Sequence, residues 1–146
     1  MPESEENPYA APSVGLHPLS PAEEKQWSVL THVLAIFFGL VASAVFFFIY
    51  KDRGPFVRAH TATEWNFQLT ITIVQTLGFV FCFGSVFGSF ASASNGTPPS
   101  IGLFFLGYFL LIAIRLVGAI WGIYAAVVAN RGKYYKYPLA IPFVKA

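Results

Sequence analysis

The fold is decided by the apolar segment at residues 101–129, IGLFFLGYFLLIAIRLVGAIWGIYAAVVA, in which Arg115 is the only charged residue. Two further, mainly apolar stretches lie at about residues 27–50 and 66–91. Each stretch exceeds the roughly 20 residues with which a helix crosses a hydrocarbon core of about 30 Å. The sequence therefore predicts an all-α membrane protein with three transmembrane helices in a compact bundle, the first and second extended beyond the bilayer.

The composition is also typical of a membrane protein. Hydrophobic residues make up 55% of the chain and charged residues 11%, and a soluble domain of this size would expose too much of that apolar surface to water. The single cysteine, Cys82, excludes an intramolecular disulfide and a Cys-rich metal site, and we expect it to be a small packing residue. Neither a cleavable signal peptide nor a transit peptide is evident, which favours a bacterial cytoplasmic (inner) membrane over an organelle.

Three segments make up the chain. Residues 1–19 are acidic and rich in proline, which predicts a disordered tail. The helical membrane domain at residues 20–132 begins with Ser20-Pro21-Ala22-Glu23, a capping box with proline at the first helical position. Gly54-Pro55 ends the first helix and suits the start of the second. A basic and aromatic tail at residues 133–146 is expected to lie in the membrane interface.

Lysines and arginines beside the spans predict the orientation, because cytoplasmic flanks carry an excess of them. The 51–58 loop holds three and the tail from residue 131 holds four, whereas Lys25 stands alone on the opposite side. We therefore expect the loop and the C-terminus in the cytoplasm and the N-terminus outside. Basic and aromatic tail residues suit anionic lipid headgroups, and those expected there are Lys133, Lys136, Tyr134 and Tyr137.

Each span carries a stripe of small or polar side chains on one helical face. Small residues let helix backbones approach closely in lipid, and Gly-x-x-x-Gly pairs are typical of such contacts. The second span has two such stripes, so we expect it to pack between the other spans or against another chain. The glycines expected at helix contacts are Gly39, Gly84, Gly88, Gly118 and Gly122.

Arg115 is the main candidate for a functional residue within the membrane, because a charge at bilayer depth is costly and usually marks a site or a partner. It shares a face with Gly118 and Gly122, so we expect it to face protein. Glu64 lies too near the cytoplasmic entrance to pair with it, which makes Gln75 the better hydrogen-bond partner. The alternatives are snorkelling to the interface, a water-filled cavity, a bound lipid phosphate and an acidic partner subunit.

A polar cluster is predicted at the cytoplasmic edge of the second span. His60 and Glu64 are four residues apart, on one helical face, and Asn66 and Gln68 follow closely. An interfacial polar pair is the simplest interpretation, with a proton relay or a metal site as the alternative. His32, alone on the inward face of the first span, is expected to be a core histidine with satisfied hydrogen bonds.

Motifs for catalysis are missing from the sequence. There is no Ser/His/Asp set, no carboxylate pair, no Gly-rich phosphate loop and no basic stripe for nucleic acid. We therefore expect a protein that is not an enzyme and that takes no cofactor, no metal and no nucleic acid.

Four stretches resemble a known family: WSVLTHVL at 27–34, GPFVRAH at 54–60, EWNFQLT at 64–70 and ANRGKYYKYPL at 129–139. The resemblance covers residues 24–145. It is to small bacterial membrane proteins of unknown function, distantly related to the twenty-kilodalton (Tic-20-like) subunit of the chloroplast inner-envelope protein translocon. Proteins of magnetosome membranes belong to the same broad group. The resemblance implies a membrane protein and, by itself, a link to protein translocation.

These observations predict a non-enzymatic small subunit or assembly factor of a membrane complex. The alternative is a homo-oligomeric channel or carrier, in which a polar helix stripe lines a path and Arg115 holds an anion. Anionic lipids at the C-terminal tail and either self-association or a larger membrane protein are the expected partners.

Overall fold

The computed structural model describes residues 17–93, 95–96 and 101–145. It contains three helices, α1 (Pro21–Tyr50), α2 (Pro55–Ala93) and α3 (Ile101–Asn130). Each is long and apolar enough to cross a membrane by length and composition, so the predicted all-α membrane bundle is confirmed. Apart from residues 17–19, the predicted tail lies outside the described residues.

The capping box predicted at the start of α1 is confirmed. The backbone N–H of Ser20 donates to the Glu23 carboxylate at 2.8 Å, and the Ser20 hydroxyl accepts from the backbone N–H of Glu23 at 3.4 Å. Pro21 occupies the first turn of the helix. This reciprocal pair satisfies N–H groups that a helix start leaves without intrahelical partners.

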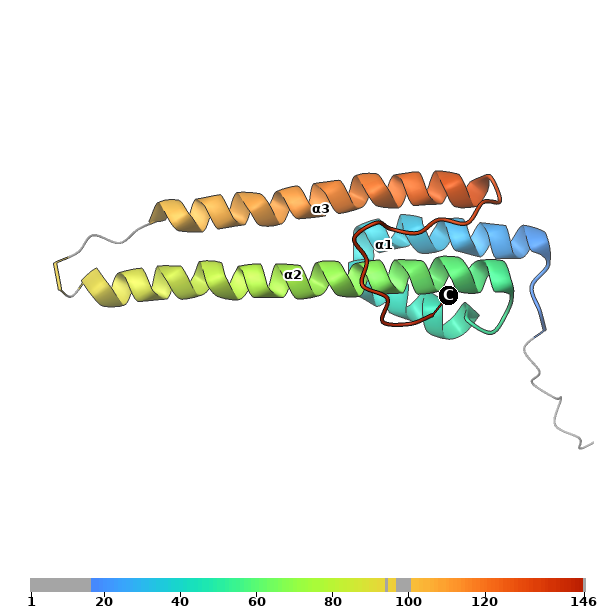
Figure 1. Ribbon diagram of the computed structural model, residues 1–146, viewed down its shortest axis with the longest axis horizontal. Coiled ribbons are helices and arrows are strands. Elements are labelled where there is room, and N and C mark those ends of the chain that lie inside the picture. The colour runs from blue at the N-terminus through green and yellow to red at the C-terminus, as the bar shows by residue number, and fades with distance from the viewer. Residues whose placement is uncertain (1–16, 94, 97–100, 146) are drawn as a thin grey trace, which may run out of the picture.

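α1 does not run straight, because its backbone leaves the helical conformation at Gly39 (φ +54°, ψ −129°). Glycine adopts such a positive φ at no steric cost. The ring of Trp27 stacks on that of Tyr50 at a centroid distance of 4.8 Å, whereas a straight helix would hold these residues about 34 Å apart. α1 is therefore a helical hairpin, and the chain returns at Gly39 (Figure 1).

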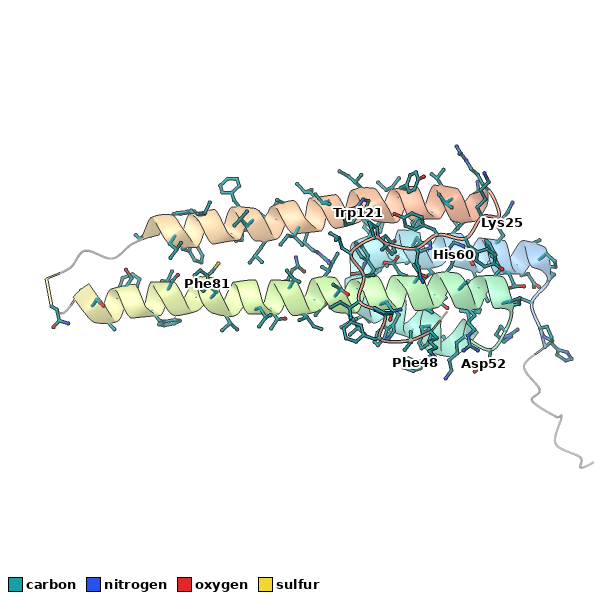
Figure 2. The ribbon with its side chains drawn as sticks, viewed as in Figure 1. Lys25, Phe48, Asp52, His60, Phe81 and Trp121 are labelled. Atoms are coloured by element: carbon teal, nitrogen blue, oxygen red, sulfur yellow. The ribbon has the colours of Figure 1, made fainter. Side chains whose placement is uncertain are left out.

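Both flanks of α1 lie at the same end of the molecule as the start of α2 and the end of α3 (Figure 1). We call this the basic end; Lys25 and Asp52 both lie there (Figure 2). The backbone N–H of Leu19 donates to the carbonyl of Arg53 at 2.8 Å. The predicted orientation, with the N-terminal flank and the first loop on opposite sides, is therefore wrong on this point, because hydrogen-bonded residues cannot lie on opposite sides of a bilayer.

Glu24 of α1 caps the start of α2, a contact between helices that was not predicted. Its carboxylate accepts from the backbone N–H of Phe56 at 2.7 Å and of Val57 at 2.9 Å. Gly54 allows this approach, because a Cβ at that position would clash with the Glu24 carboxyl group. The acidic side chain thus lies at the positive end of the α2 dipole.

The glycines of the predicted stripes differ in their surroundings. A Cβ at Gly118 would come within 2.9 Å of Ile71, and one at Gly122 within 2.9 Å of Ile36, so these positions permit close helix approach. Nothing lies within 4 Å of a Cβ built at Gly84 or Gly88. Their stripe therefore makes no helix contact within the described residues.

α2 and α3 continue well beyond the return of α1 and lie side by side there (Figure 1). Phe81 belongs to this part of α2 (Figure 2). Cys82, which is 4% exposed, packs against Gly107 of α3, as a small packing residue does.

The surface is apolar and the interior holds polar side chains, an arrangement suited to lipid surroundings. The largest fully buried side chains include His32, His60 and Glu64. Large apolar side chains are exposed on all three helices, among them Phe38, Val41 and Phe48 of α1, Phe79, Phe81 and Phe87 of α2, and Leu106, Phe109 and Ile120 of α3.

The C-terminal tail folds back along α2 (Figure 1). The side-chain amide of Asn66 exchanges two hydrogen bonds with the backbone of Val144, at 2.8 and 2.9 Å. The hydroxyl of Thr70 accepts from the backbone N–H of Ile141 at 2.9 Å. These bonds hold the tail against about one turn of α2.

Candidate functional site

The buried centre of the molecule is a chain of hydrogen bonds that we call the polar cluster, formed by His32, His60, Glu64 and Tyr137. His32 Nδ1 lies 2.6 Å from a carboxylate oxygen of Glu64. His32 Nε2 lies 2.9 Å from His60 Nδ1. Both histidines and Glu64 are 0% exposed, so the chain is shielded from solvent along its length.

Three separate segments bring the polar cluster together. His32 comes from the first half of α1, and His60 and Glu64 come from successive turns of α2. Tyr137 comes from the tail, and its ring stacks on Phe67 at a centroid distance of 3.8 Å. His60 lies between the helices near the basic end (Figure 2).

Which atoms donate along this chain of hydrogen bonds follows from its His60 end. His60 Nε2 faces the backbone oxygen of Lys133 at 3.1 Å, and a carbonyl oxygen can only accept, so Nε2 must carry a proton. When His60 is neutral, its Nδ1 accepts a hydrogen bond, and His32 Nε2 must donate it. His32 Nδ1 and Glu64 then share one further proton.

That shared proton has three hydrogen-bonded positions. It can sit on Glu64, on His32 as an imidazolium beside a carboxylate, or on His60 with His32 neutral and donating to Glu64. Moving between these states needs only proton shifts along bonds of 2.6 and 2.9 Å. The arrangement is therefore chemically competent as a proton relay.

Two further donors hold the Glu64 carboxyl group in place. The Tyr137 hydroxyl donates to the same oxygen that faces His32, and Gln68 Nε2 donates to the other oxygen at 2.8 Å. Burial, followed by the nearby negative charge of Glu64, raises the pKa of Tyr137 well above its usual value. The phenol therefore remains protonated and keeps its role as donor.

The four residues predicted to form a cluster at the cytoplasmic edge of the second span have different surroundings in the structure. His60, Glu64 and Gln68 are buried and linked to one another through the polar cluster, whereas Asn66 faces the tail. His60 and Glu64 do not bond directly, because His32 lies between them. His32 is therefore a core histidine with satisfied hydrogen bonds, as expected, but it is not alone.

Arg115 does not meet the predicted partner. Gln75 donates to the backbone oxygen of Leu111 at 3.5 Å, whereas Arg115 reaches the return of α1 at Gly39. Its guanidinium thus faces protein, as expected, although Arg115 is also exposed at the surface of the chain. Its guanidinium lies beside Gln68, at the edge of a cavity.

The predicted headgroup residues have separate environments. Tyr134 is 65% exposed, and Lys133 and Lys136 are exposed as well, so these three can meet lipid. Tyr137 is 3% exposed and belongs to the polar cluster, which corrects its assignment to headgroups. The sequence signal was its place in the Gly-x-Tyr-x-x-Tyr-Pro ending at 132–138, one of the motifs behind the family resemblance.

A metal ion is not the natural occupant of the polar cluster. Its histidines and carboxylate are arranged in a line and bond to one another rather than converging on a point. Among residues 17–93, 95–96 and 101–145, no group of three or more His, Cys, Asp or Glu side chains could hold a metal ion.

Comparison with known proteins gives one family. A model of the magnetosome magnetite crystal formation protein family matches residues 23–144, which is most of the chain and includes the polar cluster. No curated protein and no solved structure gives a match. The resemblance to magnetosome membrane proteins is thereby confirmed, without the finer relationship to the chloroplast translocon subunit. With three long apolar helices and this match, the chain is a multi-pass membrane protein that belongs to the magnetosome magnetite crystal formation protein family.

Proposed function

We propose that the protein takes part in magnetite formation as a small, non-enzymatic membrane subunit whose polar cluster holds a proton and passes it along hydrogen bonds. One observation carries this proposal: His60, His32 and Glu64 form a continuous chain, fully buried inside an apolar exterior. Ionisable residues inside membrane helices are costly and commonly form proton relays.

The chemistry of the family's product supports a proton-handling role. Magnetite forms from ferrous and ferric ions with oxide taken from water, and each water molecule that supplies oxide gives up its protons. A compartment that deposits magnetite therefore has to dispose of acid. Iron in this account is the cargo of the compartment and is not assigned to any residue of the chain.

The charges favour one orientation for this protein. Six of its nine Lys and Arg residues lie in the flanks of α1, at the start of α2 or just after the end of α3, which meet at the basic end, and the sequence between α2 and α3 has none. Under the positive-inside rule, the basic end faces the cytoplasm. Both flanks of α1 then lie on the cytoplasmic side, and α2 and α3 carry the chain across the membrane and back. His60, whose Nε2 faces the backbone oxygen of Lys133, is the cytoplasmic end of the relay.

A test in cells uses Glu64→Gln, which keeps the shape of the side chain but removes the proton-accepting carboxylate. In a magnetite-forming cell that carries this variant in place of the wild type, we expect a more acidic compartment and smaller crystals. Gln75→Leu, outside the polar cluster, is the matched control and should leave both unchanged. Normal compartment pH and normal crystals with a stably inserted Glu64→Gln protein would contradict the proposal.

The subunit role has its own test. Affinity purification in mild detergent, followed by mass spectrometry, should return a stoichiometric larger membrane protein of the magnetosome. A translocase component would instead support the link to protein translocation, and a lone homo-oligomer would support the channel or carrier.

A further inference from the structure

The return of α1 at Gly39 creates two helix ends inside the apolar part of the molecule. The first half of α1 ends there with its carbonyl groups, and the second half begins there with its N–H groups. The second half therefore directs the positive end of its dipole at this place. In membranes, irregular backbone of this kind is found where it is buried in protein or lines a cavity, and broken helices commonly form binding sites for ions.

Arg115 and Gln68 meet at this break from the other two helices. Measured from the position that a Cβ would occupy on Gly39, the Arg115 guanidinium nitrogens lie at 3.4 and 3.5 Å and Gln68 Oε1 at 3.6 Å. Glycine thus leaves open the space that both polar groups face. A side chain at position 39 would fill it.

Arg115 and Gln68 also line a cavity of about 220 Å³, together with apolar and small side chains of α1, α2 and α3. One water molecule takes a share of about 30 Å³ in the liquid, so the cavity has room for a larger guest. Arg115, which lines the cavity, is also exposed at the surface of the chain.

The Arg115 guanidinium and Gln68 Oε1 have no hydrogen-bond partner among the described residues. Arg115 makes no hydrogen bond or ion pair with any of them. Gln68 is 5% exposed, and its Oε1 is buried without a hydrogen-bond partner. Since Gln68 Nε2 already donates to Glu64 at 2.8 Å, the free atom of this amide is an acceptor.

These groups define the guest by its hydrogen-bonding pattern. A guanidinium with free donors binds negatively charged oxygens, most strongly in a bidentate fork. A buried carbonyl oxygen needs a donor, and leaving it unpaired is costly. We propose that the space between Gly39, Arg115 and Gln68 binds a small oxyanion that carries one hydroxyl group, of the hydrogen phosphate or hydrogen carbonate kind.

The charge of Glu64 does not oppose such a guest directly. Its carboxylate lies on the Nε2 side of the Gln68 amide and is already bonded to His32, Tyr137 and Gln68. Glu64 is not among the residues that line the cavity, whereas Gln68 is. The oxyanion site is thus next to the polar cluster but independent of the proposed proton relay.

Anion selectivity of the full chain in detergent tests the proposal, measured by isothermal titration calorimetry near pH 7. Phosphate and hydrogen carbonate carry a hydroxyl group at this pH, whereas sulfate does not. We expect either of the first two to bind at least about tenfold more tightly than sulfate, which is the effect of one hydrogen bond to a charged group.

Variants then separate the two polar groups. Arg115→Leu should weaken binding of every anion at least about tenfold, and Arg115→Lys should restore only part of it because lysine lacks the fork. Gln68→Leu should abolish the preference over sulfate while anion binding remains. Arg131→Leu, which removes an exposed arginine at the end of α3, is the control and should bind like the wild type.

The source of the oxyanion is distinguished in nanodiscs. If phosphatidic acid, but not phosphatidylcholine, competes with inorganic phosphate at this site, the guest is a lipid headgroup; without competition it is the free ion. Equal affinity for sulfate and phosphate, binding unchanged by Arg115→Leu, or no anion binding by the folded wild-type chain would each overturn the proposal.

Discussion

Tyr137 shows how one side chain can combine packing with proton chemistry. Its ring lies flat against Phe67, and its hydroxyl donates to the Glu64 oxygen that also faces His32. Glu64 accepts this hydrogen bond in addition to the one from Gln68, inside an apolar molecule. The residue therefore closes the polar cluster and fixes the tail over it.

Replacing Tyr137 with phenylalanine separates these two roles. Tyr137→Phe keeps the ring but removes the donor, so we expect a loss of about 1–3 kcal/mol in the free energy of unfolding. Tyr134→Phe, at an exposed tyrosine of the same tail, should change little. Chemical denaturation in detergent measures both. A Tyr137→Phe protein as stable as the wild type would show that the hydroxyl contributes no net stability.

The raised pKa of Tyr137 also predicts a dependence on pH. Burial and Glu64 raise the pKa of the folded state above the usual value of about 10, so the unfolded chain loses this proton first as pH rises. The contribution of Tyr137 is therefore fully present below pH 10 and declines as pH increases toward the raised pKa. The stability difference between wild type and Tyr137→Phe should shrink over that alkaline range, and a constant difference would contradict the assignment.

The polar cluster could be predicted from the sequence only in part. The spacing of His60 and Glu64 placed both on one face of a helix, which the structure shows. His32 is 28 positions from His60, and Tyr137 is 73 positions from Glu64. Such contacts depend on how helices and tail pack together, which spacing within one helix cannot reveal.

At the scale of helices, the return of α1 determines where the other elements meet. It brings the start of α1 to the start of α2, where Glu24 accepts two backbone hydrogen bonds. It also places the half-helix ends at Gly39 against Arg115 and Gln68. One break in one helix thus forms both a cap and a cavity.

Removal of the cap should loosen the junction of α1 and α2. We expect Glu24→Ala to lower the free energy of unfolding by about 1–3 kcal/mol, since it leaves two N–H groups at a helix start without their charged acceptor. Lys25→Ala changes an exposed neighbour in the same turn and is the control. Denaturation of both variants in detergent measures the difference, and equal stability of the two would show that water replaces Glu24 at no cost.

Helix ends were easier to predict than helix paths. Ser20, Pro21 and Glu23 marked the start of α1, and Gly54-Pro55 marked the junction, because capping and proline effects are local. The return at Gly39 has no local signal, because apolar residues continue on both sides of the glycine. At Gly39 the chain lies close to Arg115 and Gln68 of the other helices, and such contacts are not visible in the order of residues.

For the whole molecule, the segments at the two ends differ in charge. The basic end gathers both flanks of α1, the start of α2 and the end of α3, whereas the sequence between α2 and α3 carries no charge. The distribution of charge agrees better with the positive-inside rule when α1 is a hairpin, because Lys25 then lies at the basic end.

Site-directed labelling checks this arrangement. In a Cys82→Ser background, single cysteines at Ser20, Arg53 and Lys136 should all react with an impermeant maleimide only after permeabilisation. A cysteine at Asn95 should be the one that reacts from the opposite side. Labelling of position 20 together with position 95 would show that α1 crosses the membrane once, and would contradict the hairpin.

The most direct test of the central claim is proton flux through the purified protein in liposomes. With a potassium gradient and valinomycin to set the membrane potential, a pH-sensitive dye inside the vesicles should report proton entry with the wild-type chain. We expect flux to fall to the protein-free level with His32→Gln and with Glu64→Gln, and to persist with Gln75→Leu. Flux through a folded Glu64→Gln protein equal to that of the wild type, or no flux through the wild type, would contradict the account.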